Sequence, residues 1–409
     1  MVLNYIWAAL FLIAFATAAI STLFGGCTKL FADMVTATFD YAKLGFEISI
    51  GLTGVLTLWL GIMKIGERAG VVTALARFAS PLFGKLFPEI PSNHPVVGSM
   101  FMNFSANLLG LDNAATPIGL SVMRELQDLN TDKSRASNSM IMFLVINASG
   151  LTILPISVMM YRAQMGAENA ADVFIPIMIA TGVSTLTAIA ATAIKQRINL
   201  FQRAVIIPFA IFITLLGWLT YIFVTGDKEV MSTHATTVSS VILMSIISLF
   251  MLMGIIKRIN IYESFIEGAK QGFATAITII PYLIAILVAI GVFRASGAME
   301  YIISAMRIGV ESLGLNSDFT GAMPTILMKP LSGSGARGMM IDAINEYGVD
   351  SFVGRLSSVV QGSTDTTFYV VALYYGAVAV QKIRYTLTIS LFADLMGIIA
   401  AIIVSYIFW

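Results

Sequence analysis

Apolar runs recur along the whole chain, and several reach the length of about 20 residues that an α-helix needs to cross a bilayer. They cover residues 2–24, 46–63, 138–161, 172–194, 203–225, 237–256, 273–293, 355–380 and 385–408. This pattern predicts an all-α polytopic membrane protein. The first run has no Lys or Arg before it and is longer than the apolar core of a signal peptide, so we expect it to stay as a membrane helix.

Two stretches are amphipathic instead. Residues 64–87 and 294–313 mix charged side chains with apolar ones at helical spacing. Such helices lie along the membrane surface, where long basic side chains reach toward water. A loop helix packed on the bundle is the alternative.

Two apolar regions, residues 95–127 and 319–347, are interrupted by dense Gly, Ser, Asn and Pro. A backbone that leaves the helix inside hydrocarbon loses hydrogen bonds, and it is tolerated only where protein or a water-filled cavity covers it. These regions therefore predict broken helices or re-entrant hairpins. The next spans are also interrupted by small polar residues, at Asn147–Pro155 and at Gln361–Thr367.

These four clusters supply the candidate substrate-binding residues. A single Ser or Gly in a membrane helix more often serves packing, but clusters at matching places in two halves favour a function. The candidates are Asn103, Ser105, Asn107, Asp112, Asn113, Thr116, Asn147, Ser149, Ser332, Ser334, Arg337, Gln361, Ser363, Thr364, Asp365 and Thr366.

The order of elements repeats along the chain. From about residue 46, and again from about residue 273, it runs as a span, an amphipathic helix, a broken polar segment, a polar loop and two spans. Duplicated halves are the usual architecture of secondary transporters, in which the substrate site lies between the halves. The sequence leaves open whether the halves are parallel or inverted.

Composition narrows the class of function. Hydrophobic residues make up 57% of the chain and charged residues 11%, with a net charge of +1. Soluble domains carry about 25% charged residues, and no basic surface for nucleic acid is expected. One cysteine, Cys27, and two histidines give no spacing for a zinc site, and there is no Walker motif. We therefore expect no metal, no cofactor and no ATP drive.

The basic residues give a weak indication of orientation. The loop 195–203 contains three basic residues and no acid, which predicts a cytoplasmic position. The loop 162–172 would then lie on the other side.

The motifs resemble two known families. Residues 1–200 are similar to the spore maturation protein A family through the run Asn107–Gly119. Residues 237–409 are similar to the spore maturation protein B family through Lys329–Gly338 and Gln361–Tyr369. Residues 201–236 would be a connecting span and loop, so the chain looks like a fusion of two gate halves.

Both families contain the nucleoside-recognition or gate domain, which also occurs in concentrative nucleoside transporters and ferrous-iron transporters. The resemblance implies a multi-pass protein of the bacterial inner membrane that transports a small polar or anionic solute by secondary transport. A coupling cation or proton and the membrane lipid would be its partners, and the sequence leaves a homo-oligomer open.

The sequence suggests a specific role for each of two charged residues. Arg337 would hold an anionic group, and Asp365 would bind the coupling cation or proton. The alternative is a permanent ion pair that only stabilises the fold. Two other functions compete with transport: a non-transporting membrane scaffold, and, less favoured, an intramembrane enzyme with a pair of Lys329 and a nearby serine.

Overall fold

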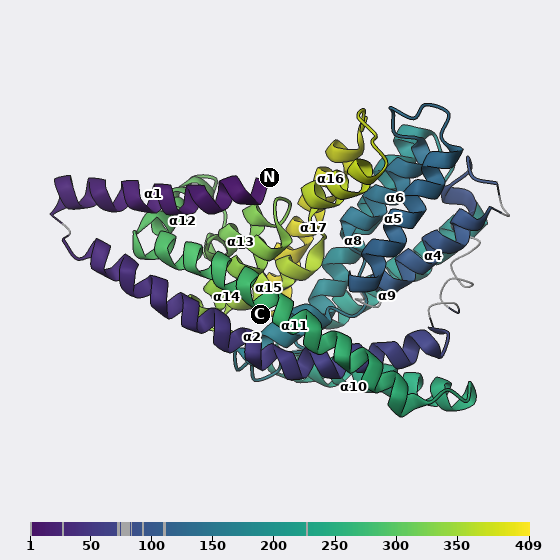
Figure 1. The fold of residues 1–409 in the computed structure, drawn as a ribbon, viewed down its shortest axis with the longest axis horizontal. Helices are drawn as coiled ribbons and strands as arrows, with labels where there is room; N and C mark the ends of the chain where they lie inside the picture. Colours follow the sequence, from purple (N-terminus) through teal and green to yellow (C-terminus); the bar gives the residue numbers. More distant parts are fainter. Residues whose placement is uncertain are drawn as a thin grey trace. The chain divides into compact units, whose positions relative to one another are not determined.

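The computed structural model describes residues 2–26, 28–71, 74, 82, 84–91, 94–108, 112–225 and 228–409, and these form helices joined by short connections (Figure 1). The only β pairing in this part of the chain is an isolated bridge between Arg135 and Lys382. The helices are α1 (Val2–Gly25), α2 (Leu30–Arg68), α4 (Pro95–Leu108), α5 (Asp112–Leu129), α6 (Asn138–Ser149), α7 (Ile156–Gln164), α8 (Phe174–Gln196), α9 (Arg203–Thr225), α10 (Lys228–Ile256), α11 (Ile261–Ala295), α12 (Ala298–Ser312), η1 (Asp318–Ala322), α13 (Met323–Met328), α14 (Gly333–Tyr347), α15 (Phe352–Ser363), α16 (Thr367–Ala377) and α17 (Thr386–Phe408).

The all-α polytopic architecture is confirmed. Among the described residues, five helices are long and apolar enough to cross a membrane, namely those at 4–24, 30–68, 174–196, 261–295 and 386–408. Two of them extend well beyond the apolar runs that predicted them. α2 has 39 residues and α11 has 35, because the helix continues through charged positions that a hydropathy pattern counts as polar.

Two predicted spans are each divided into a pair of helices. The run 138–161 forms α6 and α7, and the run 355–380 forms α15 and α16. α6 ends at Gly150, which has φ +64° and donates its N–H to Asn147 O. α16 begins after Thr366, whose backbone is extended. The amphipathic stretch 294–313 contains α12, whereas most of residues 72–81 lies outside the described part of the chain.

The described elements follow the predicted repeat. α2, α4 with α5, α6 with α7, and α8 come in the same order as α11, α13 with α14, α15 with α16, and α17. The chain also divides into two compact units, and each takes residues from both halves. Unit 1 comprises residues 1–60, 160–170 and 269–361, and unit 2 comprises residues 61–159, 171–268 and 362–409.

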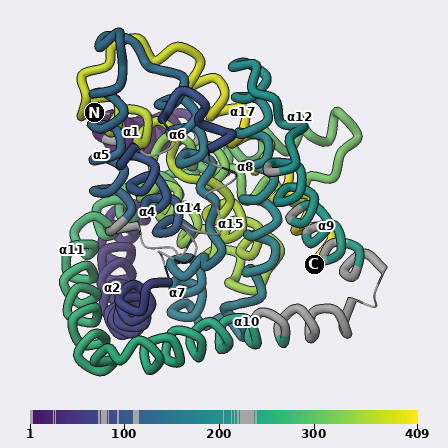
Figure 2. Tube along the Cα trace, turned by 90° about the vertical axis from the view of Figure 1, so that its right-hand side faces the viewer, coloured from purple at the N-terminus to yellow at the C-terminus, as the bar shows by residue number. Residues whose placement is uncertain are grey.

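In unit 1, α2 and α11 lie side by side along much of their length (Figure 2). Glycines allow the close approach. A Cβ at Gly45 would lie 3.1 Å from Ile284 Cα, and one at Gly272 would lie 2.6 Å from Leu56 O. Because the paired residue numbers fall on one helix as they rise on the other, the two helices are antiparallel.

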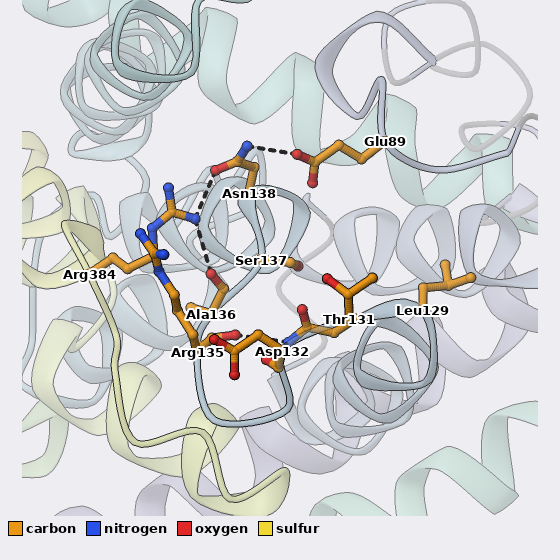
Figure 3. Close-up of a pocket in the computed structure, with 10 residues that line it drawn as sticks. Glu89, Leu129, Thr131, Asp132, Arg135, Ala136, Ser137, Asn138 and Arg384 are labelled. Atoms are coloured by element: carbon orange, nitrogen blue, oxygen red, sulfur yellow. Dashed lines mark hydrogen bonds between the residues drawn. The ribbon is translucent and has the colours of Figure 1, made fainter.

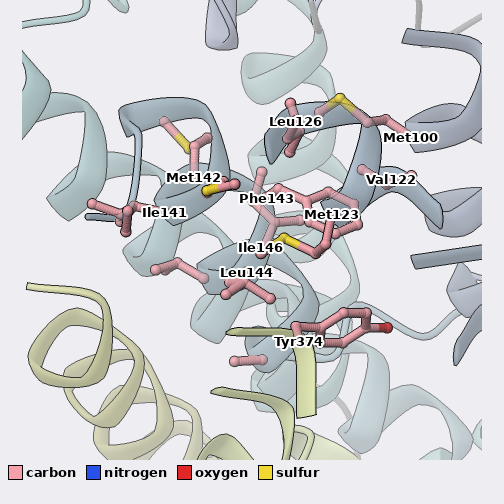
Figure 4. Packing of buried hydrophobic residues seen from close by; sticks show 14 of the residues in the cluster. Met100, Val122, Met123, Leu126, Ile141, Met142, Phe143, Leu144, Ile146 and Tyr374 are labelled. Carbon is pink, nitrogen blue, oxygen red and sulfur yellow. The ribbon is translucent and has the colours of Figure 1, made fainter. Parts of the chain in front are cut away.

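The core of unit 2 is built from α4, α5, α6, α8, α16 and α17 (Figure 4). α8 packs against α17 along most of its length. Phe143 on α6 lies edge-on to Phe104 on α4 and to Tyr374 on α16, with ring centroids 5.4 and 6.1 Å apart. Gly119 on α5 permits this packing, since a Cβ there would lie 2.4 Å from the Tyr374 hydroxyl oxygen. This apolar core surrounds the polar helix breaks described next.

Candidate functional site

The helix break between α6 and α7, in the first half of the chain, follows directly from its residue types. Ser137 caps the start of α6 by accepting a hydrogen bond from Met140 N, and Gly150 supplies the left-handed residue that ends the helix. Pro155 then precedes α7 and lacks the N–H that a continuous helix would need. The Gly150 carbonyl accepts from the Thr152 hydroxyl at 2.9 Å, so side chains replace part of the lost helical bonding.

The helix break between α15 and α16, in the second half of the chain, is formed by different residue types. α15 ends at Ser363, and Thr366 takes the N-cap position of α16 with φ −88° and ψ 94°. The Asp365 carboxylate accepts the Thr366 N–H at 2.7 Å. Asp365 therefore lies in the break with its side chain exposed, within the polar cluster Gln361–Thr367 that interrupts the predicted span.

The two breaks touch each other in unit 2. The Asp365 N–H donates to Ala148 O at 2.9 Å, which joins the second-half break to the end of α6. A Cβ at Gly150 would lie 2.6 Å from Asp365 N and 2.8 Å from the carbonyl carbon of Thr364. Only a glycine allows this contact, because both the positive φ and the missing side chain are needed.

The first broken segment joins the same place through the end of α4. Asn107 Nδ2 donates to Asn147 Oδ1 at 2.8 Å, and Ile153 N–H donates to Leu108 O at 2.9 Å. Three of the four polar clusters predicted from the sequence therefore converge in unit 2. Non-helical backbone within a membrane is tolerated only where protein or a water-filled cavity covers it. In secondary transporters, such places bind polar solutes.

The place where the two breaks meet around Ala148 and Asp365, the crossing, carries partial charges of both signs. α6 and α15 end there with their carbonyl groups, whereas α7 and α16 begin there with their free N–H groups. Helix C-termini carry partial negative charge and favour cations, and helix N-termini carry partial positive charge and favour anions. The crossing can therefore hold a cation and an anionic group at separate positions.

The remaining candidates of unit 2 lie on the same elements. Asn103 donates its Nδ2 to Ala115 O at 2.8 Å, and Ser149 donates its hydroxyl to Ile146 O at 2.7 Å. Ser105, Ser363, Thr364 and Thr366 are buried, and Thr116 is half-buried. Asp112 and Asn113 begin α5, but their side chains lie outside the described part of the structure.

The fourth cluster lies in unit 1, where the predicted half-helix start is observed. Ser332 is the N-cap of α14 and accepts from Gly335 N at 3.1 Å, and its hydroxyl lies 3.3 Å from that of Ser334. Lys329, buried, donates to Gln361 O at 2.6 Å. Arg337 is half-buried with its guanidinium 5.5 Å from the Tyr161 ring centre, a cation–π contact.

Sequence reasoning missed several polar side chains around the crossing. Thr181 on α8 donates to Gly150 O at 2.8 Å, and Thr185 lies 2.9 Å from the Ser149 hydroxyl. Ser184 and Asp394 are buried nearby on α8 and α17. The signal for Asp394 was present, since it is the one acid in the run 385–408.

A separate open pocket of about 410 Å³ lies at the other end of α6, α8 and α17 in unit 2 (Figure 3). There Arg384 donates to Ala136 O at 3.1 Å and to Asn138 Oδ1 at 2.9 Å, and Asn138 donates to Glu89 at 2.7 Å. Gln196 also donates to Asn138 O at 2.9 Å. These bonds join the start of α6 and the loop before it to Arg384, to Glu89 and to the C-terminal end of α8.

The same end of unit 2 contains many of its basic residues. Lys133, Arg135, Arg197 and Arg384 lie on the loops at this end, and Lys195 lies in the last turn of α8. Hydrogen bonds from the hydroxyl and N–H of Ser134 keep the pKa of Asp132 below its usual range. The pocket thus belongs to a basic, hydrogen-bonded end of the unit and is distinct from the crossing of the breaks.

Membrane-length helices with two breaks in contact define a polytopic membrane protein of the broken-helix class. A family model described as Gate, nucleoside recognition, matches residues 49–191 and 276–381. The chain belongs to this gate family and is related to both spore maturation proteins A and B.

Two curated relatives carry that relationship. Spore maturation protein B of Bacillus subtilis (strain 168) is 47% identical over 159 residues, which are 39% of this chain and 88% of that protein. Spore maturation protein A of the same organism is 39% identical over 186 residues, which are 46% of this chain and 91% of that protein. No solved structure matches the chain.

Proposed function

We propose that this protein is a secondary transporter for a small polar or anionic solute, with its site between the two gate repeats and its location in the bacterial inner membrane. The observation that carries the proposal is the contact between the two helix breaks, where the Asp365 N–H meets Ala148 O. Each break belongs to a different repeat, so the crossing is the place where movement of one repeat against the other would open or close a site.

The polar groups at the crossing suit a neutral polar or anionic solute. Asn107 and Asn147 offer amide donors and acceptors in an otherwise apolar core. The start of α16 offers backbone N–H groups of the kind that bind anions. Arg337, at the second turn of α14 in unit 1, is a separate candidate for binding an acidic group.

An intramembrane enzyme is the less favoured function. A serine nucleophile needs a base within hydrogen-bond reach. Lys329 donates to the Gln361 carbonyl, and Ser332 caps α14, so both side chains are engaged with backbone groups. A non-transporting scaffold remains the second candidate, because the relatives' names describe spore maturation and not transport.

Purified protein in liposomes tests the proposal. Nucleosides, amino acids and small carboxylates would be applied one class at a time on a solid-supported membrane, with uptake of each labelled compound measured in parallel. We expect one class to enter only liposomes that contain the protein. Correctly inserted protein that moves none of the three classes would favour the scaffold.

Point variants test whether the solute passes through the crossing of the two breaks. Asn107→Ala removes one neutral hydrogen bond at the crossing, worth about 1 kcal/mol, so the protein should remain folded while uptake falls. Asn199→Ala is the matched control, since Asn199 bonds only to the Phe201 N–H in its own loop among the contacts described. Arg337→Gln should reduce uptake of carboxylates more than uptake of neutral solutes. Equal uptake by Asn107→Ala and Asn199→Ala would place the route elsewhere.

A further inference from the structure

Asp394 is a buried acid in a membrane span. It lies on α17, whose apolar stretch has a mean hydropathy of 2.4, and its side chain is 2% exposed. An acid in such a setting costs several kcal/mol unless its surroundings stabilise it, and it usually marks an ion pathway or binding site.

The packing of α16 against α17 shows what lies beside Asp394. The Tyr375 and Thr386 hydroxyls are 2.7 Å apart, and a Cβ at Gly397 would lie 3.0 Å from Thr364 Cγ2. The two segments are therefore antiparallel. Eight residues back from Tyr375 is Thr367, and eight residues on from Thr386 is Asp394, so equal helical rise places these two at one height.

The neighbouring helix α8 contributes to the same place. A Cβ at Gly397 would lie 3.0 Å from Ser184 Cβ and 3.4 Å from its hydroxyl oxygen. Ser390, Asp394 and Gly397 are spaced four and three residues apart, so they share one face of α17. That face turns toward Ser184 and Thr364.

The hydroxyl groups around this face are buried and have no hydrogen-bond partner among the described residues. They belong to Ser184, Thr364, Thr367 and Ser390, whose exposed fractions are 0%, 5%, 0% and 0%. A buried hydroxyl without a partner is costly, so several of them in one place indicate a ligand that completes their bonding. Hydroxyl and carboxylate oxygens are ligands that a hard cation prefers.

The nearby helix ends favour the same sign of charge. α6 ends at Ser149, which bonds to Thr185 on α8, and α15 ends at Ser363 beside Thr364. Both helices end near these residues, and a helix C-terminus carries partial negative charge. Discontinuous helices in secondary transporters use such ends to coordinate Na⁺ or H⁺.

We propose that Asp394, with the hydroxyls of Ser184, Thr364, Thr367 and Ser390, forms a binding site for Na⁺. A proton on the carboxylate would leave the four hydroxyl groups without partners, whereas a metal cation accounts for all four hydroxyl oxygens. The role of this ion in driving transport rests on the proposed function, but its binding does not. The cation is thereby assigned to Asp394 rather than to Asp365.

The test is the thermal stability of the purified full chain in NaCl and in choline chloride of equal concentration. At Na⁺ concentrations near 100 times Kd, we expect the wild-type Tm of this 409-residue chain to rise by about 3 °C over choline. Asp394→Asn should lose this difference, and Asp128→Asn, at an exposed acid of α5, should keep it. Ser184→Ala and Thr367→Val are milder variants that should weaken the Na⁺ response if Asp394→Asn does not fold.

Three results separate the possibilities. An equal response to Na⁺ in wild type and in all three site variants would overturn the site. A wild-type Tm that responds to pH through Asp394 but not to Na⁺ would also overturn it, because the carboxyl group would then bind a proton. A site-dependent Na⁺ response in liposomes that take up no solute would support the site and count against the transport function alone.

Discussion

Gly150→Ala tests whether the contact between the two breaks is as close as the structure shows. Gly150 has φ +64°, and a Cβ there would lie 2.6 Å from Asp365 N and 2.8 Å from the Thr364 carbonyl carbon. Both atoms are backbone, so no side chain can rotate away. Alanine must either push the second-half break aside or remove the left-handed cap of α6.

The loss of folding free energy expected for Gly150→Ala has two parts. A left-handed conformation costs a non-glycine residue about 1–2 kcal/mol, and overpacking of a tight core adds about 1–3 kcal/mol. Gly166→Ala separates them, because Gly166 has φ +81° but no atom within 4 Å of the added Cβ. We therefore expect Gly150→Ala to lose about 1–3 kcal/mol more than Gly166→Ala.

The assay is Tm in detergent, followed by uptake in liposomes. The excess cost corresponds to a fall in Tm of roughly 1–4 °C beyond that of Gly166→Ala, because 1 kcal/mol shifts the Tm of a chain of 409 residues by about 1 °C. Uptake should fall with Gly150→Ala alone. If the two variants lose the same stability, the close contact between Gly150 and the second-half break does not exist in the native protein.

Two further predictions concern orientation and a buried ion pair. With Cys27 replaced, single cysteines in the loops 162–172 and 195–203 should differ in whole cells: an impermeant thiol reagent should label only the first, and labelling of only the second would reverse the orientation. Arg162, 0% exposed, donates to Val349 O at 2.8 Å and to Asp350 Oδ1 at 2.9 Å. Asp350→Ala should cost about 3–5 kcal/mol in thermal or denaturant unfolding, and adding Arg162→Met should recover part of it, because no buried guanidinium then faces a missing carboxylate. Additive losses in the double variant would show that the pair does not interact.

Local chemistry explains what the sequence could predict. Gly150 and Pro155 stop a helix wherever they occur, so the break after α6 is evident from residue types alone. The start of α14 was predictable in the same way, since Ser332 precedes two glycines in an apolar stretch. The membrane class also follows from apolar length, which needs no knowledge of tertiary contacts.

Long-range contacts explain what the sequence could not predict. The polar cluster Gln361–Thr367 indicated an interruption of the span 355–380, but not what replaces the lost helical bonds. The Asp365 N–H bonds to Ala148, more than two hundred residues earlier, and this tertiary bond compensates for the local loss of helix. Asp394 is recognisable in the sequence as the one acid in the run 385–408, but its burial and the hydroxyls that α8 and α16 bring beside it depend on tertiary contacts.

The contact between the breaks also bears on why both halves belong to one fold. In hydrocarbon, an N–H without a partner costs several kcal/mol. The Asp365 N–H of the second half finds its acceptor at the end of α6 in the first half, and α8 of the first half packs along α17 of the second. Neither half can therefore satisfy its own break alone. If the protein transports as proposed, a backbone that is stabilised only by its counterpart could exchange partners when the repeats move, as alternating access requires of a site between repeats.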